Sequence, residues 1–109
     1  MLRELKYASA VARYQSYRKA AQVLGMSQSQ LTRIIQALER DLGLTLFHRD
    51  RNGAAITAEG AAVLAEASAL LQSEERFQAR VASIRSVTKK QIRLAVGAIV
   101  AQTWLPTAI

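Results

Sequence analysis

The sequence contains no cysteine and a single histidine, His48. The lack of cysteine excludes disulfides, thiolate nucleophiles and cysteine-based zinc sites, and one histidine excludes a helical two-histidine zinc motif. Its longest charge-free apolar stretch is eight residues, 94–101, whereas a membrane-spanning helix needs about 20. The N-terminus has no recognisable signal peptide. We therefore expect a soluble intracellular protein with no metal site, no catalytic residues and no membrane partner.

Positive charge, by contrast, is plentiful and unevenly spread. The 109 residues contain 15 Lys and Arg but only 8 Asp and Glu, a formal net charge of +7. Residues 1–58 carry nine of the basic and four of the acidic side chains, whereas residues 59–88 carry three and four. A basic N-terminal half favours a polyanionic partner, namely nucleic acid or an anionic membrane surface.

Three amphipathic helices are expected in the N-terminal half. Apolar residues at helical spacing predict the first over 2–14. Ser16 is a suitable N-cap for a short second helix, and Gly25 suits the position after its end. Ser27 begins the third helix, which ends before Gly43.

The second and third helices form a candidate helix-turn-helix. Ala21 is small enough for close helix contact, Gly25 suits the turn, and Leu31 and Ile34 anchor the second helix. The opposite face of that helix carries Gln28, Ser29, Thr32, Arg33 and Gln36. No carboxylate occurs over 28–38, and Gln and Arg suit adenine and guanine edges in the major groove. The alternative is a face that is only solvated.

A hairpin is expected next, because Asn52-Gly53 is the preferred sequence for a two-residue type I′ turn. The turn would join strands at 46–51 and 54–57. A lone two-stranded hairpin is marginally stable in water, so this one should pack against the helices.

One long helix is expected from about Thr57 to about Val87. Its residues at alternating spacings of four and three form a heptad seam: Val63, Ala67, Leu70, Glu74, Phe77, Val81 and Ile84. The one polar member, Glu74, would fix the register or the specificity of pairing. This seam predicts pairing with another chain. Residues 92–96 then predict a short strand, and the end at 109 suggests a truncated domain.

At this point the sequence resembles the N-terminal portion of LysR-type transcriptional regulators over residues 1–106. The resemblance lies in Leu5-Lys6-Tyr7, Val11-Ala12, Ser16-Tyr17-Arg18-Lys19-Ala20-Ala21, Leu24-Gly25-Met26-Ser27-Gln28-Ser29, Leu38-Glu39, Leu42-Gly43-Leu44-Thr45-Leu46-Phe47, Arg49, Ile56-Thr57-Ala58-Glu59-Gly60 and Trp104-Leu105-Pro106. It implies a winged helix-turn-helix, a dimerising linker helix and the first strand of an effector domain. Family members bind promoter DNA as dimers of dimers and respond to a small co-inducer held in that effector domain.

The resemblance also implies roles for single residues. The groove-reading positions match Gln28, Ser29, Thr32, Arg33 and Gln36, and Ser27 is a further DNA-binding candidate. Ser16 and Lys19 match phosphate contacts, and Arg49, Arg51 and Asn52 match the wing. Ser29 stands where the family usually has proline, and Asn52 stands where the wing tip usually has a basic residue.

The expected fold is therefore mainly α, with a winged helix-turn-helix over 1–58, a dimerising helix over 59–88 and the start of an effector domain over 89–109. The expected function is sequence-specific recognition of double-stranded DNA by a cytoplasmic, nucleoid-associated bacterial regulator. Helix 28–42 would enter the major groove, and the wing at 47–57 would meet the minor groove or backbone. The protein would act as a homodimer, or as a homotetramer at full length, with no cofactor in these residues. The alternative is a non-specific architectural DNA-binding protein or a coiled coil at a membrane surface.

Overall fold

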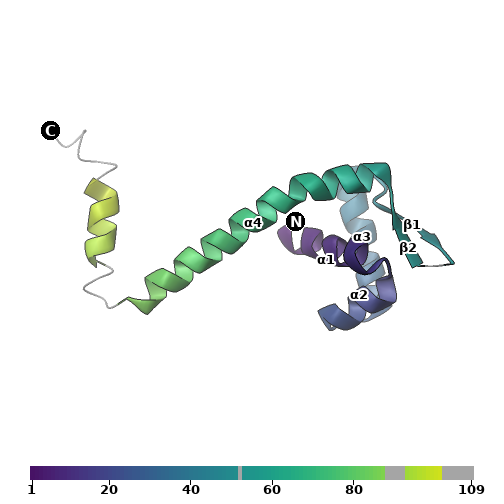
Figure 1. The fold of residues 1–109 in the computed structure, drawn as a ribbon, viewed down its shortest axis with the longest axis horizontal. Coiled ribbons are helices and arrows are strands. Elements are labelled where there is room, and N and C mark those ends of the chain that lie inside the picture. Colours follow the sequence, from purple (N-terminus) through teal and green to yellow (C-terminus); the bar gives the residue numbers. More distant parts are fainter. Residues whose placement is uncertain (52, 88–92, 102–109) are drawn as a thin grey trace. The chain divides into compact units, whose positions relative to one another are not determined.

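The computed structural model describes residues 1–51, 53–87 and 93–101 of the chain. Its elements follow in the order α1 (Leu2–Tyr14), α2 (Tyr17–Leu24), α3 (Gln28–Leu42), β1 (Phe47–Asp50), β2 (Gly53–Ile56) and α4 (Ala58–Ser86) (Figure 1). Two compact units are distinguished along the chain, Met1–Gln72 and Ser73–Ile109, and α4 contributes to both. The predicted fold class is confirmed, because three helices and a two-stranded wing precede one long helix.

The ends of α1, α2 and α3 lie where the sequence predicts them. Ser16 and Ser27 each use their side-chain oxygen to accept a hydrogen bond of 3.1 Å from the backbone N–H three residues later. Both bonds satisfy N–H groups that a helix leaves without an internal partner. Gly25 and Gly43 follow α2 and α3 with φ of 72° and 70°. These local signals set the helix-turn-helix before any tertiary contact is considered.

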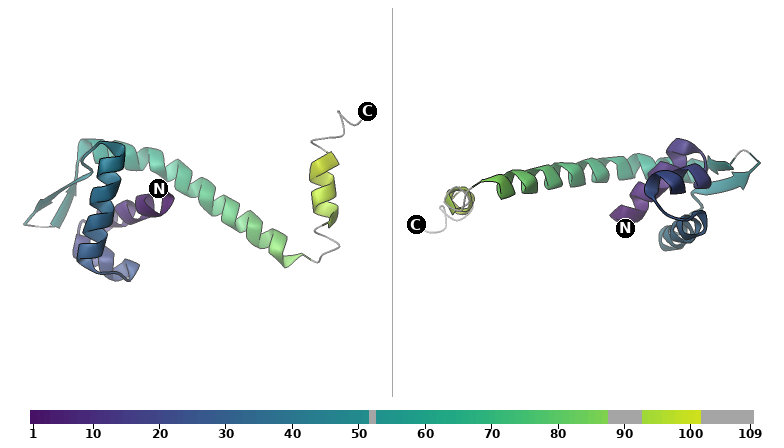
Figure 2. Two further views of the ribbon diagram at one scale, coloured as in Figure 1. Left: turned by 180° about the vertical axis from the view of Figure 1, so that it is seen from behind. Right: turned by 90° about the horizontal axis from the view of Figure 1, so that it is seen from below.

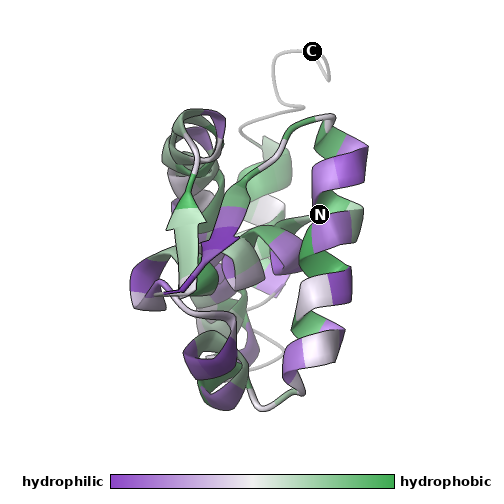
Figure 3. Cartoon of the chain, turned by 90° about the vertical axis from the view of Figure 1, so that its right-hand side faces the viewer, coloured by the Kyte–Doolittle hydropathy of each residue, from purple (hydrophilic) through white to green (hydrophobic). Residues whose placement is uncertain are grey.

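The hydrophobic core lies in the first unit, where α1, α2 and α3 pack on one another and the hairpin packs on α1. Hydrophilic and hydrophobic residues alternate along the helices, as amphipathic helices require (Figure 3). The buried apolar residues are Leu5, Ala8, Val11, Tyr17, Ala20, Ala21, Leu31, Ile35, Leu38, Leu46, Phe47, Ala54 and Ala67. They come from every element of the first unit, so the hairpin and the start of α4 are part of the same core.

The hairpin turn differs by one residue from the prediction. Asp50 pairs with Gly53 in the antiparallel register, so Gly53 begins β2 and the connection is residues 51–52. Gly53 has φ of 126°, and a Cβ atom there would collide with the carbonyl oxygen of Gln15. That carbonyl accepts a 3.0 Å hydrogen bond from Ala54 N–H. Glycine is therefore needed at 53 for close approach to the end of α1 and not as a turn residue. Asn52 lies outside the described residues.

The base of the hairpin is closed by Thr57. Its backbone N–H donates to the Leu46 carbonyl at 2.9 Å, and its hydroxyl donates to the Thr45 carbonyl at 2.6 Å. The same hydroxyl oxygen accepts from Gly60 N–H at 2.8 Å, which caps α4 as predicted. A Cβ atom at Gly60 would collide with the Leu46 carbonyl oxygen, so α4 starts in direct contact with the wing.

The strand predicted over 92–96 is wrong for the residues that can be described, because residues 93–101 are helical and exposed. A strand must pair its backbone N–H and C=O groups with a neighbour, whereas a helix pairs them internally. Residue 92 and the Trp104-Leu105-Pro106 segment lie outside the described residues. Over the described ranges, no helix is long and apolar enough to cross a membrane.

Candidate nucleic-acid interface

The polar face of α3 lies opposite the residues with which this helix joins the core. Leu31, Ile35 and Leu38 are buried. The predicted reading residues are exposed, except that Thr32 is half-buried: Gln28, Ser29, Thr32, Arg33 and Gln36. The core fixes the helix from one side and leaves hydrogen-bonding side chains free on the other. This arrangement suits a helix that enters a groove.

Four of these side chains border a hollow that also includes a residue from the wing. The hollow is lined by Gln28, Ser29, Thr32, Arg33 and Arg49. It contains two guanidinium groups, an amide and two hydroxyls, and no carboxylate. The structure therefore brings together five of the residues predicted from the sequence. Four of them lie on α3 and one lies on β1. Guanidinium, amide and hydroxyl groups can donate hydrogen bonds to phosphate oxygens and to base edges.

Arg49 joins three elements within this site. One guanidinium nitrogen donates to the hydroxyl of Thr32 on α3. The guanidinium carbon lies 4.5 Å from the centre of the Tyr17 ring on α2, which is a cation–π contact. Tyr17 is 8% exposed, and burial raises the pKa of its hydroxyl. The nearby Glu39 carboxylate raises that pKa further, and Arg49 opposes the rise.

Glu39 supports the wing from the far part of α3. Its carboxylate accepts hydrogen bonds from the backbone N–H of Leu46 at 2.6 Å and of Phe47 at 3.4 Å. No role of Glu39 or of the Tyr17 ring is predicted from the sequence. Their sequence neighbours do not predict these contacts, because the contacts join residues that are far apart in the sequence. Glu39 lies in the last turn of α3, and Tyr17 follows the N-cap of α2.

The two predicted capping residues lie at the N-termini of α2 and α3. Ser16 is half-buried and its oxygen accepts from Lys19 N–H, whereas the Lys19 side chain is exposed. Ser27 is exposed, and its oxygen lies 3.4 Å from the Ser29 hydroxyl. These hydroxyls cap their helices and still carry a proton that can be donated to an outside acceptor.

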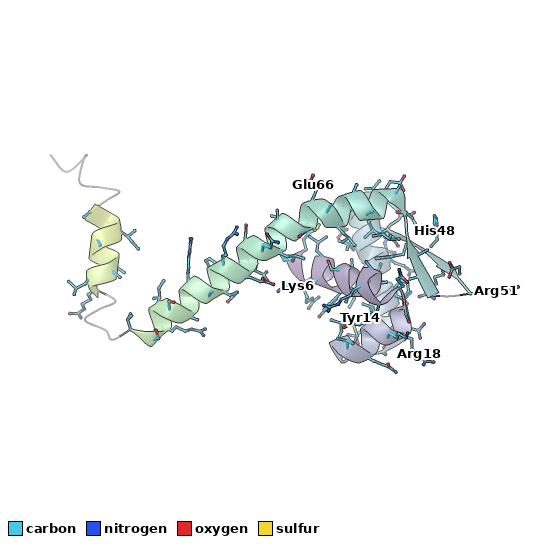
Figure 4. The ribbon with its side chains drawn as sticks, viewed as in Figure 1. Lys6, Tyr14, Arg18, His48, Arg51 and Glu66 are labelled. Atoms are coloured by element: carbon cyan, nitrogen blue, oxygen red, sulfur yellow. The ribbon has the colours of Figure 1, made fainter. Side chains whose placement is uncertain are left out.

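The wing projects away from the three helices in both views of Figure 2. Arg51 lies at its tip, His48 lies nearer its base, and Arg18 lies on α2 (Figure 4). All three are exposed, and Arg51 is accessible to a partner at the tip. In the part of the chain that the structure describes, no three His, Cys, Asp or Glu side chains form a group that could hold a metal ion.

The predicted seam along α4 is divided by the structure. Ala67 is 3% exposed and belongs to the core of the first unit, and Val63 packs against that core. Ala67 is therefore unavailable to a partner, because α4 docks on its own chain there. The remaining seam residues are exposed or half-buried: Leu70, Glu74, Phe77, Val81 and Ile84. The three large apolar residues among them are 51–62% exposed.

An apolar groove lies beside the first part of this seam. It is lined by Met1, Leu5, Leu42, Ala62, Val63, Glu66, Ala67 and Leu70. These residues come from α1, from the end of α3 and from α4. The groove shares Val63, Ala67 and Leu70 with the predicted seam, and all of its lining residues belong to the first unit.

Several curated proteins are similar to the chain. It is 46% identical over 79 residues to the HTH-type transcriptional regulator TfdT of Cupriavidus pinatubonensis, covering 72% of this chain and 35% of that protein. It is 33% identical over 99 residues to the RuBisCO operon transcriptional regulator of Allochromatium vinosum, covering 91% of this chain and 33% of that protein. The chain thus spans about a third of the length of these relatives, which are regulators and not enzymes.

Solved structures show the same fold. The CbnR DBD–DNA complex superposes with a TM-score of 0.71 and 40% identity, over 76% of this chain and 95% of that one. The BenM DBD/catB site 1 DNA complex superposes with a TM-score of 0.74 and 35% identity, over 81% and 99%. Residues 2–61 match the family described as bacterial regulatory helix-turn-helix proteins, lysR family. The match covers more than half of the sequence and all of the winged helix-turn-helix, and the chain therefore belongs to the LysR family of bacterial helix-turn-helix regulators.

Proposed function

We propose that this chain recognises a specific sequence of double-stranded promoter DNA. The observation that carries the proposal is the hollow in which four polar residues of α3 meet Arg49 of the wing without a carboxylate. In this proposal α3 lies in the major groove, and the wing lies against the minor groove or the backbone. Two similar structures are complexes with DNA, which supports DNA binding by this chain.

The side chains divide into those that read bases and those that hold the backbone. Gln28 and Gln36 suit adenine, Arg33 suits guanine, and Thr32 suits a thymine methyl or either edge. A second set would hold phosphates and carries no sequence information: Ser16, Lys19, Ser27, Arg51 and Asn52. Ser29, in the first turn of α3, would add a hydroxyl where the family usually has proline.

We also propose that α4 pairs with α4 of a second copy through its exposed seam. Leu70, Phe77 and Ile84 would be covered in such a dimer. The charges on α4 suit an antiparallel pair, because Glu59 and Glu66 make its first half acidic. In its second half three arginines outnumber two glutamates and leave a net charge of +1: Arg76, Arg80 and Arg85 against Glu74 and Glu75. Two antiparallel copies would place each acidic half against a basic half.

The rest of the proposal concerns the longer proteins that the relatives represent. We propose that a whole regulator of this kind forms a homodimer or a homotetramer and controls a promoter. It would bind a co-inducer outside these residues. Such a protein would act in the bacterial cytoplasm at the nucleoid and would have no catalytic activity. Within residues 1–109 no cofactor is proposed.

Selection of bound sequences from a random duplex pool tests this function. We expect enrichment of one half-site and its repeat, and an affinity that falls with salt by about 0.9 log unit per phosphate contact for each log unit of salt. Bound duplexes with no shared sequence, together with the same salt dependence, would instead indicate an architectural DNA-binding protein. Binding to anionic vesicles but not to duplex would indicate a coiled coil at a membrane surface.

Two substitutions separate reading from backbone contact. Arg33→Ala should cost about 1–3 kcal/mol of binding free energy at one base position. Lys19→Ala should weaken binding to all duplexes alike and reduce the salt dependence. Equal losses on selected and random duplexes for Arg33→Ala would contradict the reading role of α3.

A further inference from the structure

Arg49 makes contacts within the protein that a simple phosphate-binding arginine does not need. It donates to the Thr32 hydroxyl on α3 and lies over the Tyr17 ring on α2. A solvated arginine keeps its rotamer freedom, whereas this guanidinium is held between a hydroxyl and a ring face. The side chain therefore connects the wing to both helices of the helix-turn-helix.

The Tyr17 ring is a fixed support for this contact. It is 8% exposed and packs edge-to-face on Phe47, with ring centres 6.1 Å apart and an interplanar angle of 75°. Phe47 is the first residue of β1, two positions before Arg49, so the ring contacts the same strand twice. Because Tyr17 is buried, it cannot itself be a major contact to DNA.

A second attachment holds the same strand further along α3. The Glu39 carboxylate accepts from the backbone N–H groups of Leu46 and Phe47. Thr32 and Glu39 are seven residues apart, two turns along one face of α3, which corresponds to about 10 Å along the axis. Two attachments at that separation fix the direction of β1 relative to α3, where one would leave a pivot.

We propose that Arg49 is a positioning residue that sets the direction of the wing relative to the recognition helix before DNA is bound. It acts through Tyr17 and Thr32, and its effect is on the geometry of recognition as well as on charge. The inference rests on the proposed function, because it assigns Arg49 a part in discrimination between DNA sequences. Pre-organised contacts bind more tightly because less order is lost on association.

Charge and positioning predict different outcomes for Arg49→Lys. Lysine keeps the charge that a phosphate attracts, but it lacks the planar guanidinium that lies on a ring and donates in a fixed direction. If Arg49 acts only as a charge, the lysine variant should discriminate between sequences as well as the parent does. If it positions the wing, the lysine variant should lose discrimination although the charge is unchanged.

The test measures dissociation constants for a selected and a random duplex and takes their ratio as the preference. We expect Arg49→Lys and Tyr17→Leu each to lower the preference about tenfold. The double variant should lose no more than Arg49→Lys alone, because that substitution already removes the contact with the Tyr17 ring. Tyr17→Phe, which keeps the ring, should restore the preference that Tyr17→Leu loses.

Arg13→Lys is a matched control, because Arg13 lies over the half-buried Tyr14 ring, at 5.8 Å on α1 and outside the hollow. Thermal unfolding of each variant identifies losses caused by a poorly folded protein. Should Tyr17→Leu fail to fold, Arg49→Lys still carries the test, since Arg49 is exposed. In the free protein, NMR should show the Arg49 Nε–H resonance shifted by the Tyr17 ring, and Tyr17→Phe should keep that shift.

The outcomes separate this inference from the function on which it rests. A parent protein with no preference for any duplex would overturn the proposed function and the role of Arg49 together. A parent protein that discriminates, with Arg49→Lys retaining the preference within about twofold, would overturn the positioning role alone. Additive losses in the double variant would do the same.

Discussion

The first unit, Met1–Gln72, and the second unit, Ser73–Ile109, use their apolar residues in opposite ways. Among the described residues, every buried apolar side chain lies in the first unit and no residue of the second unit is buried. Phe77 and Ile84 nevertheless occur there at a spacing of seven residues, as regularly as core residues do. The first unit contains what it needs to fold, whereas the apolar residues of the second require another surface to cover them.

The two units should differ most in how a truncated apolar side chain changes the free energy of unfolding. Leu38 is 1% exposed, so Leu38→Ala should lower the free energy of unfolding by about 2–5 kcal/mol, through lost burial and the cavity left behind. Phe77 is 62% exposed, and Phe77→Ala should change the free energy of unfolding by less than about 0.5 kcal/mol at dilutions where the protein is monomeric. Urea denaturation measures both. Equal effects would show that the two units do not differ as described.

A charge on the seam should act on association and leave folding nearly unchanged. Leu70 is 56% exposed, and Leu70→Glu should raise the dimer dissociation constant about 100-fold, because a carboxylate would be buried at the interface. Ala69→Glu is the matched control, since Ala69 is the exposed neighbour outside the seam. Sedimentation equilibrium gives both constants. An unchanged dimer in Leu70→Glu would refute pairing through this face.

An added Cβ atom should also have different effects in the two units, at Gly53 in the first and at Gly97 in the second. Gly53 has φ of 126° and lies against the Gln15 carbonyl, so Gly53→Ala should destabilise the first unit by about 1–3 kcal/mol. Gly97 lies in the helical segment 93–101 with nothing near its missing Cβ, so Gly97→Ala should be neutral or increase helicity. Thermal unfolding and circular dichroism distinguish the two. A harmless Gly53→Ala would mean that the wing can leave α1 at little cost.

The smallest expected effect concerns Glu4 on α1. The N-terminal amine of Met1 lies 2.9 Å from its carboxylate and lowers the pKa of Glu4 from 4.5 to about 2. A lowered pKa favours the folded state above pH 4.5, and this contribution is lost as the pH falls through about 2. Glu4→Gln should therefore flatten the dependence of unfolding on pH between these values. Glu75→Gln, on exposed α4, is the control, and identical profiles for the two variants would contradict the ion pair.

Local signals predicted the helices of the first unit well. Ser16, Ser27, Gly25 and Gly43 set helix ends through backbone hydrogen bonds and φ angles that depend on one or two residues. The polar face of α3 was predicted from helical periodicity and residue type, and the wing residue Arg49 from the family resemblance. These five predicted residues line one hollow. Their individual roles toward DNA stay predictions.

Features that depend on distant residues were missed or misplaced. Gly53 resembled a turn residue because Asn-Gly is a strong turn signal, yet its position is decided by Gln15 in another element. Ala67 fitted the heptad seam because the same spacing serves a partner helix and the chain's own core. The strand over 92–96 rested on a pattern too short to distinguish from a helix. The contacts of Tyr17, Glu39 and Arg49 had no sequence signal at all.

The hydrogen bonds of Thr57 have a consequence for how such a chain can change over time. At the base of the hairpin, Thr57 donates hydrogen bonds to the carbonyls of Leu46 and Thr45. Gly60, near the start of α4, packs against the same Leu46 carbonyl. Substitutions or insertions at the exposed tip therefore leave the core and the direction of α3 intact. The wing tip can therefore diversify among descendants of one fold while the rest of the first unit keeps its structure.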